Sequence, residues 1–254
     1  MAGFAEKIRL FVAADLGENA EIPLAREQAH YLSTVMRRQP GDRLRVFNGR
    51  DGEWVAEIVA ADKRGGTLCL LSHARPQAAP PDVWLAFAPL KKARTDFVAE
   101  KACEMGCRRL IPVLTRYTNA ERVNTARLGA HAIEAAEQCG LLNVPEVAAP
   151  QSLDAFLADL GPRQVMFCDE SGAGAPAAAA LKQAPPGPWA VLIGPEGGFS
   201  PEEAARLRAH PGSHAVSLGP RILRADTAAV AALTVWQTLL GDWERGPQDQ
   251  GAPG

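Results

Sequence analysis

The stretch VLIGPEGGFSPEE, residues 191–203, decides the fold of the longer part of this chain. It opens as an apolar strand, passes through a loop of glycines and a proline, and enters a helix that begins with a capping-box pattern of Ser200, Pro201 and Glu203. The loop lacks the Gly-Lys-Ser/Thr ending of a Walker loop and the Gly-x-Gly-x-x-Gly pattern of a dinucleotide site. Its glycines allow a ligand to approach the backbone closely, and an ordinary strand-to-helix connection is the alternative. We therefore predict a ligand-binding loop here.

A second stretch of the same design is LGPRILRADTA, residues 218–228, which runs from a strand end through a Gly-Pro loop into a helix. We expect Asp226 or Thr227 to cap that helix. Ile222 and Leu223 are placed to cover a flat ring while the arginines on either side face an anion. In the alternative interpretation, the two apolar residues belong to the core and the arginines are solvated.

The charge is distributed unevenly along the 254 residues, whose net charge of −2 by itself argues against nucleic-acid binding. Residues 91–127 carry nine basic and four acidic residues, whereas residues 128–254 carry seven basic and 14 acidic ones. Affinity for phosphates depends on the local field rather than on the total. Lys91, Lys92 and Arg94 precede a predicted helix, and this segment is either a phosphate site or a solvated basic loop. Arginine supplies 21 of the 27 basic residues, which reflects either phosphate contacts or genome composition.

The composition excludes several classes of protein. A hydrophobic content of 47% is too high for a disordered or fibrous chain, and no apolar run reaches the roughly 18 to 20 residues of a membrane span. The N-terminal segment lacks the layout of a signal peptide, and the five cysteines are scattered, which indicates reduced thiols and a cytoplasmic protein. Cys103 and Cys107 have no further histidine or cysteine pair nearby, so we expect no metal site.

The rest of the chain divides into two patterns. Up to residue 75, short strands and tight turns surround one helix at 26–38, which predicts a small β-barrel. After a Pro- and Ala-rich linker at 74–81, strands and helices alternate, which predicts an α/β domain with a mainly parallel sheet and helices on both faces. We thus predict domains at 1–75 and 76–243 and a disordered tail at 244–254. The expected strands are 9–13, 43–47, 54–60, 67–71, 83–88, 110–114, 164–168, 189–193 and 214–218, and the expected helices of the second domain are 96–105, 125–139, one from 200, and 227–240.

Five motifs occur in order along the chain, and together they resemble the RsmE family of bacterial ribosomal RNA methyltransferases over about residues 8–243. They are HYLxxVMR from His30 with Gly41-Asp42 after it, KxxEMG from Lys101, EQCG from Glu137, IGPEGG from Ile193 and LGPRILR from Leu218. The resemblance implies a PUA-like β-barrel followed by a methyltransferase domain of the SPOUT class, whose C-terminal chain forms a trefoil knot. It also implies a homodimer, a bound S-adenosylmethionine, and methylation of N3 of a uridine in the 16S rRNA of the small ribosomal subunit.

The resemblance further implies roles for particular residues. The knot loops bind the cofactor, and their residues here are Leu192, Ile193, Gly194, Pro195, Glu196, Gly197, Gly198, Leu218, Gly219, Ile222, Leu223 and Arg224. As catalytic groups, we expect Arg224 to stabilise the negative charge that develops on the uracil, and Glu196 and Asp226 to accept the N3 proton or orient the base. For Glu196, bracing of its own loop is an equal alternative. The expected RNA-binding residues are Arg9, Arg37, Arg38, Arg45, Lys91, Lys92 and Arg94.

The chain departs from the family pattern at two places. Asp226 stands where family members commonly carry a glutamate, so the carboxylate is one methylene shorter. Leu141 and Leu142 stand where the family often has an arginine, which removes a cation from a predicted RNA surface. Two other functions stay open as alternatives. One is a SPOUT methyltransferase with another target, such as the ribose 2′-oxygen of transfer RNA, and the other is a non-enzymatic RNA-binding or ribosome-assembly factor.

Overall fold

The computed structural model describes residues 8–119 and 122–244, and these form two compact units. The first unit contains the described residues up to Ala79 together with residues 136–143, and the second contains the remaining described residues. Residues 136–143 thus pack with the first unit, although residues 80–135 of the second unit separate them from Ala79 in the sequence. The predicted disordered tail at 244–254 lies outside the described residues except for Glu244.

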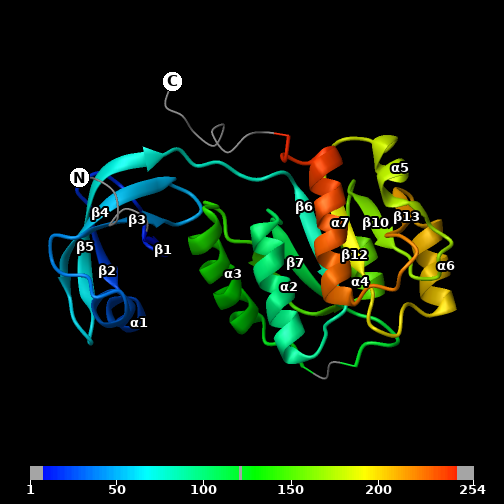
Figure 1. The fold of residues 1–254 in the computed structure, drawn as a ribbon, viewed down its shortest axis with the longest axis horizontal. Helices are drawn as coiled ribbons and strands as arrows, with labels where there is room; N and C mark the ends of the chain where they lie inside the picture. Colours follow the sequence, from blue (N-terminus) through cyan, green and yellow to red (C-terminus); the bar gives the residue numbers. More distant parts are fainter. Residues whose placement is uncertain (1–7, 120–121, 245–254) are drawn as a thin grey trace. The chain divides into compact units, whose positions relative to one another are not determined.

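The first unit is built on a five-stranded sheet with the strand order β1-β3-β4-β5-β2 (Figure 1). Its elements are β1 Arg9–Phe11, β2 Glu21–Leu24, α1 Arg26–His30 with its continuation as a π-helix, η2 Tyr31–Val35, β3 Arg43–Phe47, β4 Glu53–Ala61 and β5 Gly66–Arg75. Strands β1 and β3 pair in parallel, and the other pairs are antiparallel. The sequence pattern does not predict β2, a short strand that contains Pro23. It lies at the sheet edge, where a residue without a backbone N–H donor is tolerated.

The second unit contains a parallel sheet with the order β11-β13-β10-β12-β6-β7-β8, and β9 pairs with β7 beside it. The strands are β6 Val83–Phe87, β7 Arg109–Leu114, β8 Glu146–Val147, β9 Gln151–Ser152, β10 Gln164–Cys168, β11 Ala175–Pro176, β12 Trp189–Ile193 and β13 Ser213–Ser217. Every pair in this sheet is parallel, which confirms the predicted α/β class. Strands β10 and β12 have the predicted bounds.

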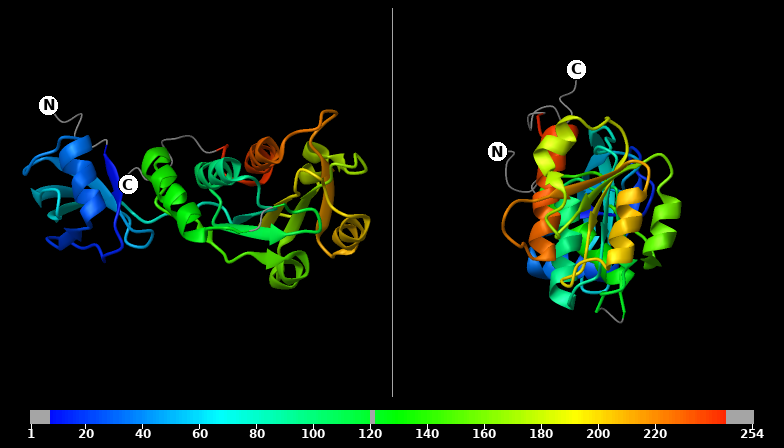
Figure 2. Two further views of the ribbon diagram at one scale, coloured as in Figure 1. Left: turned by 90° about the horizontal axis from the view of Figure 1, so that it is seen from below. Right: turned by 90° about the vertical axis from the view of Figure 1, so that its right-hand side faces the viewer.

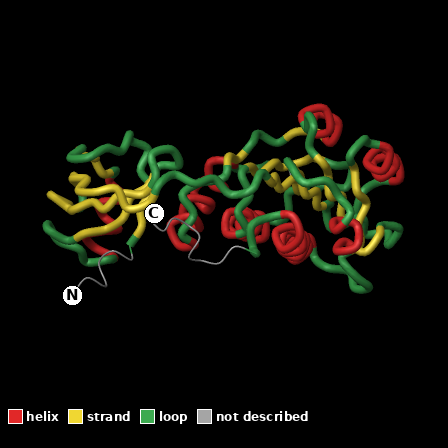
Figure 3. The backbone as a smooth tube through the Cα atoms, turned by 90° about the horizontal axis from the view of Figure 1, so that it is seen from above, coloured by secondary structure: helices red, strands yellow, loops and turns green. Residues whose placement is uncertain are grey.

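Helices cover both faces of the parallel sheet, as predicted (Figures 2 and 3). They are α2 Lys92–Glu104, α3 Thr125–Cys139, α4 Leu153–Asp159, α5 Ala177–Lys182, α6 Pro201–Ala209 and α7 Ala225–Leu240. Residues of α2, α5 and α7 share one buried core with the sheet, and residues of α4 and α6 share another. Strand β12 supplies both cores alternately, with Val191 in the first and Leu192 in the second, which explains why all five of its residues are buried. Among the described residues, no helix has the length and apolar character that a membrane crossing requires.

Helix boundaries follow the capping signals in two cases and depart from them in one. The predicted capping box of α6 is present, since the Ser200 hydroxyl accepts from the Glu203 backbone N–H at 3.3 Å and the Glu203 carboxylate accepts from that of Ser200 at 2.9 Å. Gly106 follows α2 with φ +74°, as the C-terminal glycine should. The prediction that Asp226 or Thr227 caps α7 is wrong, because the helix begins at Ala225 and its N-cap is Arg224. Asp226 lies in the first turn, where its negative charge suits the helix dipole.

Candidate functional site

Three loops lie side by side at the carboxyl ends of the parallel strands, because they follow the neighbouring strands β13, β10 and β12. Two of them are the predicted loops at 193–198 and 218–224. The third, DESGAG at 169–174, carries no motif that predicts it, and its position after a buried strand is the one signal in the sequence. Asp169 anchors this loop through Arg208 and Ser171. Burial alone would raise the pKa of Asp169, but these hydrogen bonds and the charge of Arg208 lower it.

The thiol at the end of β10 is excluded as a nucleophile. Cys168 is buried, and burial together with the nearby charge of Glu170 raises its pKa to about 12. The thiol is therefore protonated at neutral pH, whereas the thiolate is the reactive form. No group of three or more metal-ligating side chains occurs in the described parts of the chain.

The first glycine loop is held in a conformation that only glycine adopts easily. Gly198 has φ +72°, and a Cβ atom there would collide with the Glu170 carboxylate. That carboxylate accepts a hydrogen bond from the Phe199 backbone N–H at 2.9 Å, so the loop after β10 fixes the loop after β12. A Cβ atom on Gly194 would lie 2.6 Å from the Phe199 ring. Both glycines are therefore required by the packing of the loop itself, whereas Glu196 and Gly197 between them are exposed.

The second loop presents an isoleucine that has no place in the core. Ile222 is 96% exposed, while Leu218 and Leu223 are half-buried. Gly219 has φ +113° with open space around its Cβ position. Ile222 is therefore not a core residue, and this part of the alternative interpretation is wrong. An exposed aliphatic side chain on a glycine-bearing loop is available to cover the apolar ring of a ligand.

Arg94 forms ion pairs with one acidic residue of the first loop and with one that follows the second loop. Its guanidinium forms an ion pair with Glu196 of the first loop, and its Nε lies 3.8 Å from Asp226 Oδ2 at the start of α7. Two of the three predicted catalytic residues thus share one cation, which the sequence assigned to RNA. The third, Arg224, is exposed and forms no ion pair with any residue that the structure describes.

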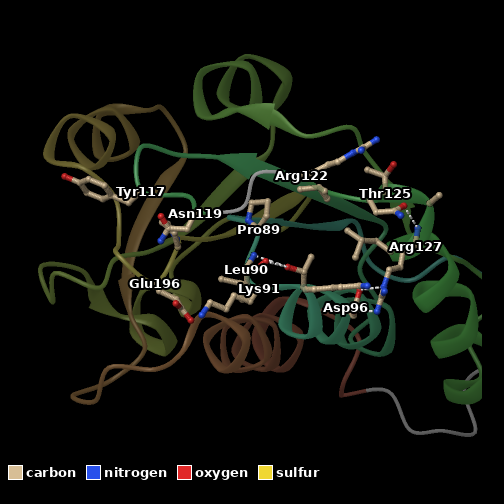
Figure 4. A pocket seen from close by; sticks show the side chains of 17 residues that line it. Pro89, Leu90, Lys91, Asp96, Tyr117, Asn119, Arg122, Thr125, Arg127 and Glu196 are labelled. Carbon is tan, nitrogen blue, oxygen red and sulfur yellow. Dashed lines mark hydrogen bonds and ion pairs between the residues drawn. The ribbon is translucent and has the colours of Figure 1, made fainter.

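A cavity of about 1020 Å³ adjoins this cluster (Figure 4). It gathers Pro195 and Glu196 of the predicted cofactor set with Lys91 and Lys92 of the predicted RNA set. The helix begins earlier than predicted, at Lys92 rather than Asp96, so Lys91 is the N-cap of α2 and Lys92 is its first residue. Asp96 lies in the cavity wall, where Arg127 binds both of its carboxylate oxygens at 2.9 and 2.6 Å.

The structure gives the predicted RNA-binding arginines of the first unit different surroundings. Arg9 and Arg45 contact the buried carboxylate of Glu53 at 2.6 and 3.0 Å, and the Arg9 side chain is only 10% exposed. Arg37 and Arg38 follow η2, and Arg37 is exposed. The predicted RNA-binding arginines of the first unit therefore differ, since Arg9 and Arg45 bind a buried carboxylate whereas Arg37 is exposed.

The comparisons with known proteins agree with both units. A model described as an RNA methyltransferase domain matches residues 77–237, and one described as an RNA methyltransferase PUA domain matches residues 24–68. Ribosomal RNA small subunit methyltransferase E from Rickettsia conorii is 30% identical over 89% of this chain and 93% of its own length. The enzyme of that name from Synechocystis is 34% identical over 94% of this chain and 80% of its own length.

Solved structures are similar over nearly the whole chain. A methyltransferase from Legionella pneumophila in complex with S-adenosylmethionine has a TM-score of 0.83 and 29% identity, covering 92% of this chain and 98% of its own. The ribosomal RNA small subunit methyltransferase E of Neisseria gonorrhoeae, bound to S-adenosylmethionine, has a TM-score of 0.84 at 24% identity and covers 93% of this chain and 99% of its own. With a family model over more than half of the sequence and relatives of at least 30% identity over most of it, the chain belongs to the RsmE family of ribosomal RNA small-subunit methyltransferases.

Proposed function

We propose that this chain transfers a methyl group from S-adenosylmethionine to N3 of a uridine in the 16S rRNA of the small ribosomal subunit. The observation that carries the proposal is the cluster of Arg94, Glu196 and Asp226, which joins the two predicted cofactor loops beside a cavity with basic walls. The family resemblance supplies the reaction, and the names of the relatives supply the class of RNA. A ribosomal substrate further places the enzyme in the cytoplasm.

The loop residues fit the proposed cofactor. When bound, S-adenosylmethionine supplies an electrophilic methyl group on a positively charged sulfur. Gly197 of the first loop and Gly219 of the second are exposed, so a ligand can approach the backbone there, and Ile222 offers an apolar surface to a flat ring. The charges of Arg94, Glu196 and Asp226 sum to −1, and this residual negative charge suits a sulfonium cation. We retain the full predicted set for cofactor binding, namely Leu192 to Gly198, Leu218, Gly219 and Ile222 to Arg224.

The reaction requires that the N3–H bond of the uridine breaks and an N3–methyl bond forms. Glu196 or Asp226 accepts the proton in this proposal, because both carboxylates lie at the junction of the two loops. Arg224 stabilises the uracil anion, since its exposed guanidinium is not engaged by a described carboxylate. Arg94 holds the two carboxylates in place, so it acts on the reaction as a positioning residue.

For RNA binding we propose Lys91 and Lys92 beside the loops, and Arg37 and Arg38 in the first unit. Arg9 and Arg45 are assigned a structural role instead, because both bind the buried Glu53. We also propose a homodimer, as the resemblance implies, and sedimentation equilibrium tests it. A protein that sediments as a monomer while methylating at full rate contradicts this part.

The experiment that tests the function uses small subunits from a strain that lacks the methylation. The purified chain is incubated with these subunits and methyl-labelled S-adenosylmethionine, and the labelled nucleoside is identified by mass spectrometry. We expect 3-methyluridine. A 2′-O-methyl nucleoside points to the other SPOUT activity, and an unlabelled RNA with no calorimetric binding of the cofactor overturns the enzymatic proposal altogether.

A further inference from the structure

The cavity beside Glu196 is larger than the proposed reaction alone requires. Its volume of about 1020 Å³ lies at the upper end of the roughly 300–1,000 Å³ of small-molecule sites. The predicted cofactor residues contribute only Pro195 and Glu196, at one end. Figure 4 shows the other end bounded by Arg122, Thr125 and Arg127, at and before the start of α3. The cavity therefore has room for a ligand that extends beyond one nucleoside.

Among the lining residues that the structure describes, each carboxylate is paired with an arginine. Asp96 is buried and receives two hydrogen bonds from Arg127, and Glu196 is paired with Arg94. These acids therefore do not repel an anionic ligand strongly. The lining cations that form no ion pair with a described residue are Lys91, Lys92 and Arg122. The remaining field of the cavity is positive, which favours an anion.

The uncharged lining combines flat apolar surfaces with hydrogen-bonding groups. The apolar residues are Pro89, Leu90, Val123, Leu128 and Pro195, and the neutral polar ones include Asn119, Asn124 and Thr125. Nucleotides present a matching combination, since each has a flat base with polar edges and a phosphate. Proteins recognise single-stranded RNA in this way, by base contacts together with cations for the backbone.

We infer that this cavity binds a single-stranded RNA segment, with the reacting nucleotide at the Glu196 end and the phosphodiester of a neighbouring nucleotide near Arg122. The inference rests on the proposed function, which places the reacting base beside Glu196. A base that leaves its stack to reach the cofactor carries its flanking phosphates with it. The cations at the two ends of the cavity bind those phosphates and thereby position the base.

The first test measures the salt dependence of RNA binding for Lys91→Ala, Lys92→Ala and Arg122→Ala. Binding to undermethylated small subunits is followed by filter retention over about 50–200 mM salt. Each substitution should reduce the slope of log affinity against log salt by about 0.7 to 1. Lys182→Ala is the matched control, because Lys182 is an exposed lysine of α5 outside the cavity. A slope equal to wild type in all three variants overturns the inference.

The second test fills the cavity without changing its charge. Ala126 lines the cavity on the first turn of α3, and Ala130 is an exposed alanine one turn later that does not line it. Ala126→Trp should weaken binding of the small subunit at least tenfold, whereas Ala130→Trp should leave it unchanged. Calorimetry should give the same cofactor affinity for both variants. Equal RNA binding by the two tryptophan variants also refutes the inference.

These measurements separate the inference from the proposed function. If the variants lose RNA affinity but the wild-type chain makes no 3-methyluridine, the cavity binds RNA and the proposed reaction is wrong. If the wild-type chain makes 3-methyluridine and the cavity variants bind and methylate normally, the reaction is right and the cavity does not hold the RNA.

Discussion

A buried glutamate in the first unit leads to a quantitative prediction of stability. Glu53 is fully buried, and its carboxylate accepts from Arg9 at 2.6 Å, from Arg45 at 3.0 Å and from two nitrogens of Arg75 at 2.9 Å. Arg9 also donates to the Leu141 carbonyl at 2.7 Å, and Arg75 donates to that of Gly140 at 3.0 Å. Arg9 and Arg75 therefore join the sheet to the segment at 136–143 through contacts that do not depend on Glu53.

We predict that Glu53→Gln lowers the free energy of unfolding by about 3 kcal/mol. The amide keeps the shape of the side chain but removes the negative charge that Arg9, Arg45 and Arg75 share. Removing one partner of a buried ion pair costs about 3–5 kcal/mol. The lower end applies here, because the Arg45 side chain is 32% exposed and water screens part of its charge. Typical unfolding free energies are about 5–15 kcal/mol, so the loss is substantial.

The pH dependence has a definite sign. Burial alone would raise the pKa of Glu53, but the hydrogen bonds and charges of Arg75 and Arg9 outweigh it and lower the pKa. A carboxylate with a lowered pKa in the folded state stabilises the protein above its unfolded pKa, which is about 4.3 for glutamate, and this contribution is lost as the pH falls below that value. The stability difference between wild type and Glu53→Gln should therefore be full at pH 7 and shrink below about pH 4.

Urea unfolding followed by circular dichroism measures both effects. Asp15→Asn is the control, because the Asp15 carboxylate is 95% exposed and accepts from a single arginine, Arg50, at 2.6 Å. This substitution should not change stability measurably. A Glu53→Gln variant within about 1 kcal/mol of wild type at pH 7 would refute the reasoning, and so would a stability difference that does not depend on pH.

Three further predictions concern the site. Arg94→Ala should lower kcat by about 100-fold, and Arg94→Lys should restore part of that activity. In a double-mutant cycle, the losses caused by Arg94→Ala and Glu196→Gln should not add. Additive losses would show that Arg94 does not act through Glu196. Arg224→Ala should abolish methylation while calorimetry finds a cofactor affinity within a few fold of wild type, and persistent activity removes Arg224 from the reaction. Gly198→Ala should weaken cofactor binding at least tenfold because of its φ of +72° and the Glu170 carboxylate beside it, whereas Gly17→Ala, with open space around it, should bind normally.

The sequence predicts best those elements whose burial and whose ends are both indicated by neighbouring residues in the chain. Strand β12 is apolar throughout and lies between Pro188 and Gly194, so its ends and its place in the sheet interior are readable. The same holds for the start of α6, where the cap residues are three positions apart. The two-residue strands β8 and β11 and the six-residue helix α5 carry too little periodicity to stand out from the loops around them.

The contacts within the site have no comparable sequence signal. Arg94 reads as one cation of a basic run, yet its partner Glu196 is 102 positions further along the chain. Outside the site, Glu53 directly precedes a predicted strand, and only the convergence of Arg9, Arg45 and Arg75 from other strands explains its burial. Asp226, one methylene shorter than the residue common in the family, stays 3.8 Å from Arg94, which is an ion pair but not a hydrogen bond.

The chemistry of the cations supports our proposal that Lys91 and Lys92 bind RNA. An arginine presents a planar array of donors that matches a carboxylate, whereas a lysine is a flexible point charge that suits a phosphate in any direction. Accordingly, Arg9 and Arg45 serve Glu53 and Arg94 serves Glu196, while Lys91 and Lys92 carry no ion pair with a described residue and face the cavity. Because arginines neutralise Asp96 and Glu196, the lining cations Lys91, Lys92 and Arg122 make the described lining of the cavity positive in a protein whose net charge is −2.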